Sequence, residues 1–156
     1  MNFQEMNVHT RGDPSSATIL QSLDAFGGAA VRAPLRVFLV EDSPEVRDLL
    51  LDYLHVAGEV EIVGYADTED DAVAAVFAKP VDAVIVDLKL RLGSGMEVLR
   101  RLREAGQIPA PTLIVFTNHP LPAIRARAMK FGADFFFDKS IDYEKVRGTL
   151  LALRQK

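Results

Sequence analysis

Two adjacent carboxylates, Glu41 and Asp42, stand directly after the apolar run Leu35–Val40. Residues with reactive or hydrogen-bonding side chains also follow three later apolar runs: Asp87 and Thr117 directly, and Lys139 one residue further on. Because ligands of an open parallel sheet bind outside the carboxyl ends of its strands, these five residues are the candidates for chemistry. They meet at one edge of a sheet if the run before Glu41 and the run before Asp87 form neighbouring strands.

Three close carboxylates repel one another, so one or more takes up a proton unless a cation offsets their charge. Mg²⁺ can do so, because it prefers oxygen ligands and binds through one or two carboxylates together with phosphate oxygens. We expect Asp42, Asp87 and a loop carbonyl as its ligands, with Glu41 contributing mainly charge. A carboxylate beside the metal can attack a phosphoryl group. Lys139 then supplies positive charge from the opposite side, and Thr117 donates a hydrogen bond to a phosphoryl oxygen.

Taken singly, these residues also have ordinary explanations. Asp42 fits a helix capping box with Glu45, three positions later. Asp87 and Thr117 suit turns, because such side chains hydrogen-bond to nearby backbone. Lys139 alone is typical of surface charge. Both interpretations stay open for each residue, and only the shared position after successive strands favours a site.

Short apolar runs alternate with amphipathic segments from Leu35 onward, which is typical of βαβ units around a parallel sheet. The runs are Leu35–Val40, Val60–Tyr65, Ala83–Val86, Thr112–Phe116 and Asp134–Phe137. Ser43 suits the cap of the first helix and Gly58 its C-terminal turn. Similar signals occur at Thr68, Gly106 and Gly132. The predicted fold class is α/β, a doubly wound five-stranded parallel sheet with helices on both faces.

The composition narrows the function classes. The chain has 156 residues, 49% of them hydrophobic, with a formal net charge of -4 and no cysteine. The negative charge argues against nucleic acid or an anionic membrane as the main partner. The absence of cysteine excludes disulfides, thiolate metal sites and cysteine nucleophiles. No apolar run reaches the roughly 18 to 20 residues of a membrane span, so we expect a cytoplasmic protein with no membrane partner.

The chain is predicted to divide into an N-terminal extension, residues 1–34, and one domain over residues 35–156. The extension is polar at first and then rich in glycine and alanine. It contains an apolar stripe at helical spacing: Ile19, Leu20, Leu23 and Phe26. Two interpretations remain open, a partly disordered leader and a short amphipathic helix for docking or dimerisation.

From Leu35 to Lys156 the chain resembles the CheY-like receiver domain of the two-component response-regulator family. The matching residues are Glu41 and Asp42 in VEDSP, Asp87 in VIVDLKL, Gly95 in GSGMEVL, Thr117 in VFTN, and Lys139 in GADFFFDKS. The resemblance implies strand order 2-1-3-4-5. It also implies Mg²⁺-dependent transfer of a phosphoryl group to Asp87 from a histidine kinase or phosphotransfer protein, with the loop carbonyl at Lys89.

The resemblance further implies that the domain is not an enzyme beyond this self-catalysed transfer and its own slow dephosphorylation. Switching involves Thr117 and Phe136, with Thr117 moving toward the phosphoryl group and Phe136 adopting an inward rotamer. Several residues depart from the common family pattern: Ser140 after the lysine, Arg91 in the loop after Asp87, and Asn118 after the threonine. Lys89 and His119 are expected near the site, where they affect how water reaches the acyl phosphate.

Because the chain ends at Lys156, directly after the last helical pattern, we expect a stand-alone receiver that acts by binding a protein partner. The expected surface is the fourth helix, fifth strand and fifth helix, with Arg125, Arg127, Lys130, Tyr143 and Arg147; a homodimer is left open. One alternative is a phosphorelay intermediate or phosphate sink. An aspartyl-phosphate phosphohydrolase is disfavoured, because Lys89 stands where such enzymes need a second acid. A flavodoxin-type carrier ranks last, because VEDSPEV lacks a phosphate-cradling loop.

Overall fold

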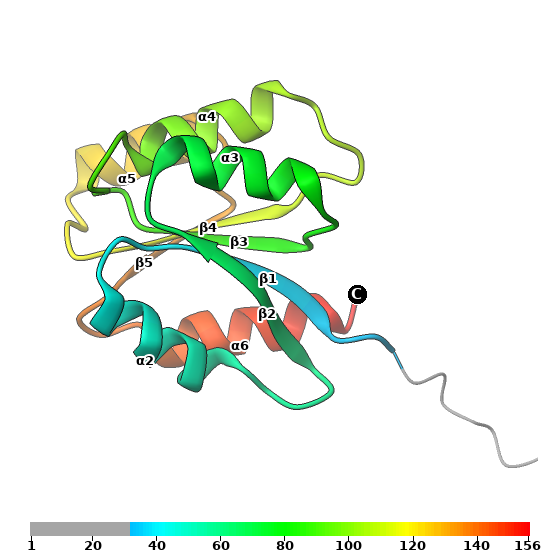
Figure 1. Cartoon of the computed structure of the whole chain (residues 1–156). Helices are drawn as coiled ribbons and strands as arrows, with labels where there is room; N and C mark the ends of the chain where they lie inside the picture. The colour runs from blue at the N-terminus through cyan, green and yellow to red at the C-terminus, as the bar shows by residue number, and fades with distance from the viewer. Residues whose placement is uncertain (1–31) are drawn as a thin grey trace, which may run out of the picture. The chain divides into compact units, whose positions relative to one another are not determined.

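A computed structural model describes residues 32–156, of which Ala33–Lys156 form one compact unit. The apolar stripe predicted between Ile19 and Phe26 lies outside the described residues, and the division at residue 34 stays a prediction. Within residues 32–156, five parallel strands form a single sheet in the order β2-β1-β3-β4-β5 (Figure 1). The predicted fold class and strand order are therefore confirmed.

The strands are short and mostly buried. They are β1 (Leu35–Val40), β2 (Val60–Ala66), β3 (Ala83–Val86), β4 (Thr112–Thr117) and β5 (Phe135–Asp138). All four residues of β3 are buried, as expected for a central strand covered on both faces. Since β1 and β3 are neighbours, the strands that precede Glu41 and Asp87 end side by side.

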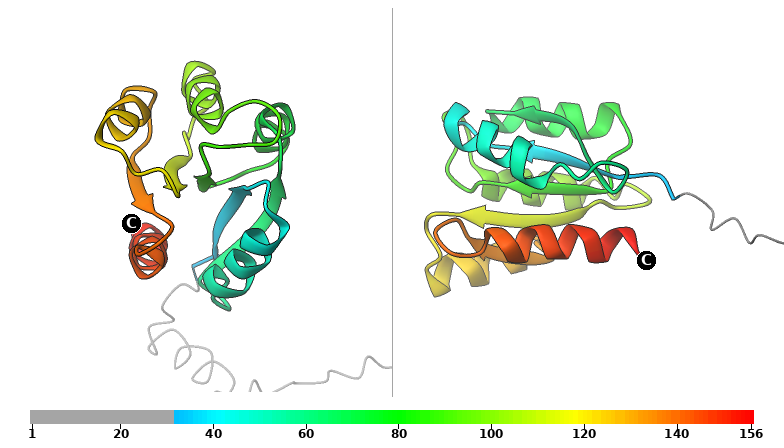
Figure 2. Two further views of the ribbon diagram at one scale, coloured as in Figure 1. Left: turned by 90° about the vertical axis from the view of Figure 1, so that its left-hand side faces the viewer. Right: turned by 90° about the horizontal axis from the view of Figure 1, so that it is seen from below.

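In the described part of the chain, five helices cover the two faces of the sheet: α2 (Pro44–Leu54), α3 (Glu69–Ala78), α4 (Gly95–Glu104), α5 (Pro122–Lys130) and α6 (Tyr143–Arg154). The end-on view in Figure 2 shows α2 and α6 on one face, and α3, α4 and α5 on the other. Within residues 32–156, no helix is long and apolar enough to cross a bilayer.

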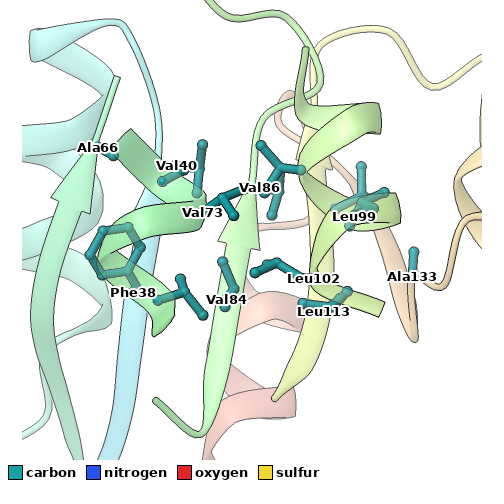
Figure 3. Packing of buried hydrophobic residues seen from close by; sticks show 14 of the residues in the cluster. Phe38, Val40, Ala66, Val73, Val84, Val86, Leu99, Leu102, Leu113 and Ala133 are labelled. Carbon is teal, nitrogen blue, oxygen red and sulfur yellow. The ribbon is translucent and has the colours of Figure 1, made fainter. Parts of the chain in front are cut away.

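The sheet separates two hydrophobic clusters. The cluster beneath α3, α4 and α5 includes Phe38, Val84 and Leu99 (Figure 3). Phe136 belongs to the same cluster. The cluster beneath α2 and α6 includes Leu39, Ile85, Phe116 and Leu150. Alternate residues of β1 and β3 supply the two clusters, because successive side chains of a strand point to opposite faces. The buried sheet thus fixes the positions of the loops at its carboxyl edge.

The element boundaries differ from the predicted ones at two strands that concern the site. β4 extends by one residue, so that Thr117 is its last residue and not the residue after it. β5 begins at Phe135 and not at Asp134. The reason is a tertiary contact, because the Asp134 carboxylate accepts hydrogen bonds from the backbone N–H of Leu113, at 2.7 Å, and from Arg103, at 2.5 Å. Asp134 therefore acts as a cap beside the strand.

The helix start signals predicted at Ser43 and Thr68 are confirmed, since each side chain accepts a hydrogen bond from a backbone N–H of its helix. The prediction for Gly58 is wrong. α2 ends at Leu54 with His55 in an extended conformation, and Val56 pairs with Val60 in an antiparallel bridge. Gly58, with φ +74°, instead occupies the tight turn between these two residues.

Candidate functional site

A buried ammonium lies between two carboxylates at the carboxyl edge of the sheet. The Nζ of Lys139 donates to Oδ2 of Asp87 over 2.9 Å and also to Oε2 of Glu41. Glu41 is 2% exposed, Lys139 7% and Asp87 9%. Lys139 is therefore not a surface charge, and the simpler explanation for that residue is wrong. Buried charges of this kind need partners, which each group here provides for the other.

Asp42 completes an acidic cluster with these residues. Glu41, Asp42 and Asp87 each place one carboxylate oxygen within 4.8 Å of the others. All three line a cleft of about 360 Å³ together with Ser43, Val46, Lys89, Asn118, His119 and Lys139. The structure thus brings together four of the five residues selected from the sequence, and the carboxylate set can hold a hard cation.

The start of α2 fixes the acidic pair. Ser43 is the capping residue of α2, with its Oγ accepting from the Val46 N–H at 3.3 Å, so the alternative of Asp42 as the cap is wrong. The backbone N–H of Ser43 donates to Oε1 of Glu41 over 3.0 Å. Glu41 therefore uses one oxygen for Ser43 and the other for Lys139, whereas Asp42 lies at the cleft. This arrangement is consistent with different contributions from the two acids.

The loop after Asp87 and the start of α4 both contact Asp87. The Lys89 N–H donates to Oδ1 of Asp87 over 3.3 Å, so both carboxylate oxygens of Asp87 are engaged. Gly95 packs directly against the Asp87 backbone, because a Cβ at position 95 would lie 2.0 Å from the Asp87 carbonyl oxygen. A glycine is therefore required for α4 to begin this close to the strand end.

Burial and charge act in opposite directions on the pKa values of this pair. Burial raises the pKa of the Glu41 carboxyl above its ordinary value, against the hydrogen bond from Lys139, which lowers it. Burial lowers the pKa of the Lys139 ammonium, but the hydrogen bond with Glu41 and the charge of Asp87 outweigh burial and raise it overall. The ammonium pairs with Glu41 and Asp87, and the Asp42 carboxylate beside them adds the negative charge that attracts a cation.

Thr117 lies next to this cleft and not among its lining residues. The residue is fully buried and lines an adjoining cavity of about 350 Å³, which shares Lys89 and His119 with the cleft. Its Oγ1 accepts from the His119 N–H over 3.2 Å, which is the turn geometry that the sequence also suggested. Because the Thr117 hydroxyl acts as an acceptor in this bond, its hydrogen remains available to donate to another group.

Phe136 and its neighbours show how much of the expected partner surface is exposed. Phe136 is buried in the cluster under α5, and the Arg125 guanidinium lies 5.5 Å from its ring centroid. Arg127 and Lys130 are exposed on α5. Tyr143 packs edge-on against Phe116, with ring centroids 4.9 Å apart, so part of its ring belongs to the opposite cluster. Among the basic residues expected on this surface, the exposed ones therefore lie on α5, whereas Arg147 of α6 is half-buried.

Two residues that depart from the common family pattern, Ser140 and Arg91, make contacts within their own loops or with neighbouring residues. Within the described residues, the single cis peptide bond is Ile108–Pro109, so the Lys139–Ser140 bond is trans. Ser140 donates from its N–H and its hydroxyl to Oδ1 of Asp138, which holds the loop after Lys139 without a proline. Arg91, in the loop after Asp87, pairs with Asp67 at 3.0 Å.

Sequence reasoning missed several contacts around the site. Ser43 was selected as a helix cap but not as the residue whose backbone orients Glu41. Glu69 was not selected, although its carboxylate accepts from Ser94 in the loop after Asp87. Glu69 follows the helix cap Thr68, and an acidic residue at that position is already explained by the helix dipole. The sequence around Glu69 therefore gives no sign of its contact with Ser94, 25 residues away.

Comparisons with known proteins identify the family of this chain and several of its relatives. Residues 37–150 match the response regulator receiver domain. A protein-glutamate methylesterase/protein-glutamine glutaminase of Syntrophus aciditrophicus is 37% identical over 81 residues, which are 52% of this chain and 23% of that protein. The transcriptional regulatory protein TrcR of Mycobacterium tuberculosis is 30% identical over 97% of this chain and 57% of its own length.

A solved structure has a similar fold. A LuxR-family two-component response regulator of Aurantimonas sp. superimposes with a TM-score of 0.71 at 25% identity, over 79% of this chain and 86% of that one. The chain therefore belongs to the response regulator receiver domain family, whose members generally act as phosphoacceptors in two-component systems. The match with this chain spans about a quarter of the length of the methylesterase/glutaminase and just over half of the length of TrcR.

Proposed function

We propose that this receiver domain accepts a phosphoryl group on Asp87 in a Mg²⁺-dependent reaction and that the modification changes its affinity for a protein partner. The phosphoryl donor is a histidine kinase or a phosphotransfer protein. The observation that carries the proposal is the position of Asp87, which lies against the Lys139 ammonium and, together with Glu41 and Asp42, borders an accessible cleft. The proposal includes a cytoplasmic location for this protein, because a histidine kinase that donates the phosphoryl group depends on ATP.

The residues at the cleft fit Mg²⁺. Carboxylate oxygens are the ligands that this ion prefers, and the three acids approach one another closely enough to share one. Asp42 and Asp87 would bind it directly, and the Lys89 carbonyl would add a ligand. Glu41 would contribute mainly charge, because its side chain is only 3% exposed, against 11% for Asp87, and it binds both Ser43 and Lys139. The bound ion would neutralise charge on the transferred phosphoryl group.

Asp87 would act as the nucleophile. One of its carboxylate oxygens forms a bond to phosphorus while the phosphorus–nitrogen bond of the donor's phosphohistidine breaks, and the electron pair leaves with the imidazole nitrogen. Lys139 stays protonated, as its raised pKa favours, and offsets charge on the phosphoryl oxygens. Thr117 donates its hydroxyl hydrogen to one of those oxygens. The same domain catalyses slow hydrolysis of the acyl phosphate and has no other enzymatic activity.

The switch would connect Thr117 to the surface around α5. Movement of Thr117 toward the phosphoryl group changes the space beside Phe136, whose ring lies under Arg125. A shift in the preferred rotamer of Phe136 then alters the face formed by α5, β5 and α6. That face would bind a downstream protein and no nucleic acid, and a homodimer through it is compatible with the proposal. A relay or phosphate sink would use the same chemistry without a downstream partner.

Intact mass spectrometry tests the acceptor role. With Mg²⁺ and acetyl phosphate, the full chain should gain the mass of one phosphoryl group, and Asp87→Ala should gain none. Asp48→Ala is the matched control, because Asp48 is an exposed carboxylate on α2 that does not line the cleft. The proposal is wrong if the wild-type protein takes up no phosphoryl group or if Asp87→Ala is labelled like the wild type.

A further inference from the structure

The segment Leu88–Ser94, here called the acceptor loop, connects Asp87 to α4 and folds back on itself. Lys89 and Ser94 form an antiparallel bridge across its base, and the Gly95 N–H donates to the Leu88 carbonyl over 3.0 Å. At the same base the Lys89 N–H donates to Oδ1 of Asp87. The position of this base therefore affects both the Asp87 carboxylate and the backbone at Lys89.

Glu69, the first residue of α3, holds this loop from outside. Its Oε2 accepts from the Ser94 N–H over 3.1 Å, and its own N–H donates to the Leu92 carbonyl over 3.1 Å. Its Oε1 accepts from Arg101 of α4 over 2.9 Å. The Glu69 side chain is 19% exposed, so these bonds are partly shielded from water. α3 and α4 lie on the same face of the sheet, which makes this contact between their starts feasible (Figure 1).

The contact with Glu69 leaves no spare space at the tip of the loop. Gly93 has φ +80°, and a Cβ at that position would lie 2.4 Å from Cβ of Glu69. A second connection joins Arg91 to Asp67, but both side chains are well exposed, so this ion pair contributes little on its own. Of these two polar contacts with the loop, the one made by Glu69 is therefore the more shielded from water.

We propose that Glu69 is a positioning residue for the phosphoryl site, which fastens the acceptor loop through the Ser94 N–H and thereby fixes Asp87 and the Lys89 backbone before any ligand binds. The inference rests on the proposed function of Asp87. An acidic residue in the first turn of a helix interacts favourably with the helix dipole wherever it points. That interaction explains neither the bond to Ser94 nor the close approach of Gly93.

The physical consequence is preorganisation. If Glu69 is lost, the acceptor loop is free to sample other conformations, and binding a cation must then order it again. Groups that orient metal ligands from outside change metal affinity by about 10-fold to 100-fold when they are removed. We therefore expect weaker Mg²⁺ binding and a more open loop, with the fold otherwise retained.

Two measurements on the full chain test this positioning role, with Glu69→Gln, Glu69→Ala and the control Glu104→Gln. Glu104 is also a carboxylate paired with an arginine of α4, but it does not contact the acceptor loop. Amide hydrogen exchange without metal should be faster over residues 88–95 in both Glu69 variants, most in Glu69→Ala, and unchanged in the control. Equal exchange in all four proteins would overturn the inference.

The second measurement is a calorimetric titration with Mg²⁺ alone, followed by acetyl phosphate labelling at increasing Mg²⁺ concentration. We expect the Mg²⁺ dissociation constant to rise about tenfold in Glu69→Ala, with labelling restored at saturating Mg²⁺. Unchanged Mg²⁺ affinity would contradict the positioning role. Failure of the wild-type protein to become labelled would reject the proposed function of Asp87, whereas the hydrogen exchange result would still decide whether Glu69 fastens the loop.

Discussion

The Nζ of Lys139 lies 2.9 Å from Oδ2 of Asp87, although 52 residues separate the two in the sequence. The same ammonium binds Glu41, and all three groups are almost completely buried. A lysine in this position cannot leave without exposing two buried carboxylates to mutual repulsion. The most informative predictions therefore concern charge at this cluster.

Replacing Lys139 by methionine retains most of the side-chain volume and removes the charge. We expect phosphoryl uptake from acetyl phosphate to slow by about 10²-fold, which is typical for loss of one group that stabilises developing charge. Mg²⁺ should bind more tightly to the variant, because a competing cation is gone. Labelling rates and calorimetry check both effects. An unchanged labelling rate would rule out a role for this ammonium in the transfer.

The two adjacent acids are expected to differ in their effect on the metal. Asp42→Asn should weaken Mg²⁺ binding more than Glu41→Gln, because Asp42 lies at the cleft while Glu41 is occupied by Ser43 and Lys139. Calorimetric titration of both variants measures the difference, with Asp48→Asn as the control. Equal losses of affinity would show that the proposed division between ligand and supporting charge is incorrect.

The raised pKa of Glu41, caused first by burial, predicts a pH dependence of stability. A group whose pKa is higher in the folded protein stabilises it at low pH, and this contribution is lost as the pH rises through the raised pKa. Without Mg²⁺, the unfolding free energy of the wild-type protein should therefore fall relative to that of Glu41→Gln as the pH rises from about 4, the ordinary carboxyl range, through the raised pKa of Glu41. Urea unfolding at several pH values checks the sign. A difference that moves the opposite way would mean that Glu41 ionises more easily in the folded state.

Gly95 and Gly148 form a matched pair for a packing test. Gly95→Ala should lower the unfolding free energy by about 1 to 3 kcal/mol, because the new Cβ would collide with the Asp87 backbone. Gly148 is exposed in α6 with nothing within 4 Å of an added Cβ, so Gly148→Ala should stabilise by up to about 1 kcal/mol. Urea unfolding measures both. Equal effects of the two substitutions would contradict the close packing of α4 on Asp87.

Much of this architecture was predictable because it depends on local patterns. The apolar runs identified all five strands, since a parallel sheet covered on both faces needs continuous burial. Ser43 and Thr68 were identified as caps because their side chains act on the next few residues. The joint position of Glu41, Asp87 and Lys139 followed from one rule about strand ends.

The errors arose where tertiary contacts override local preference. Asp134 looked like the start of a strand, but its carboxylate caps Leu113 and binds Arg103 instead. Gly58 looked like a helix end, but pairing between Val56 and Val60 placed it in a turn. Glu69 could not be selected because its partner, Ser94, is distant in sequence and contributes a backbone group, which no residue pattern reveals.

The most direct test of the central claim is to locate the phosphoryl group. The protein is labelled with acetyl phosphate and Mg²⁺, the acyl phosphate is reduced with borohydride, and the digested chain is sequenced by tandem mass spectrometry. We predict reduction at Asp87 alone among the carboxylates of the cluster, because only Asp87 has one oxygen against the Lys139 ammonium and the other at the Lys89 N–H. A label on Asp42 or Glu41, or no reducible label at all, would contradict the account.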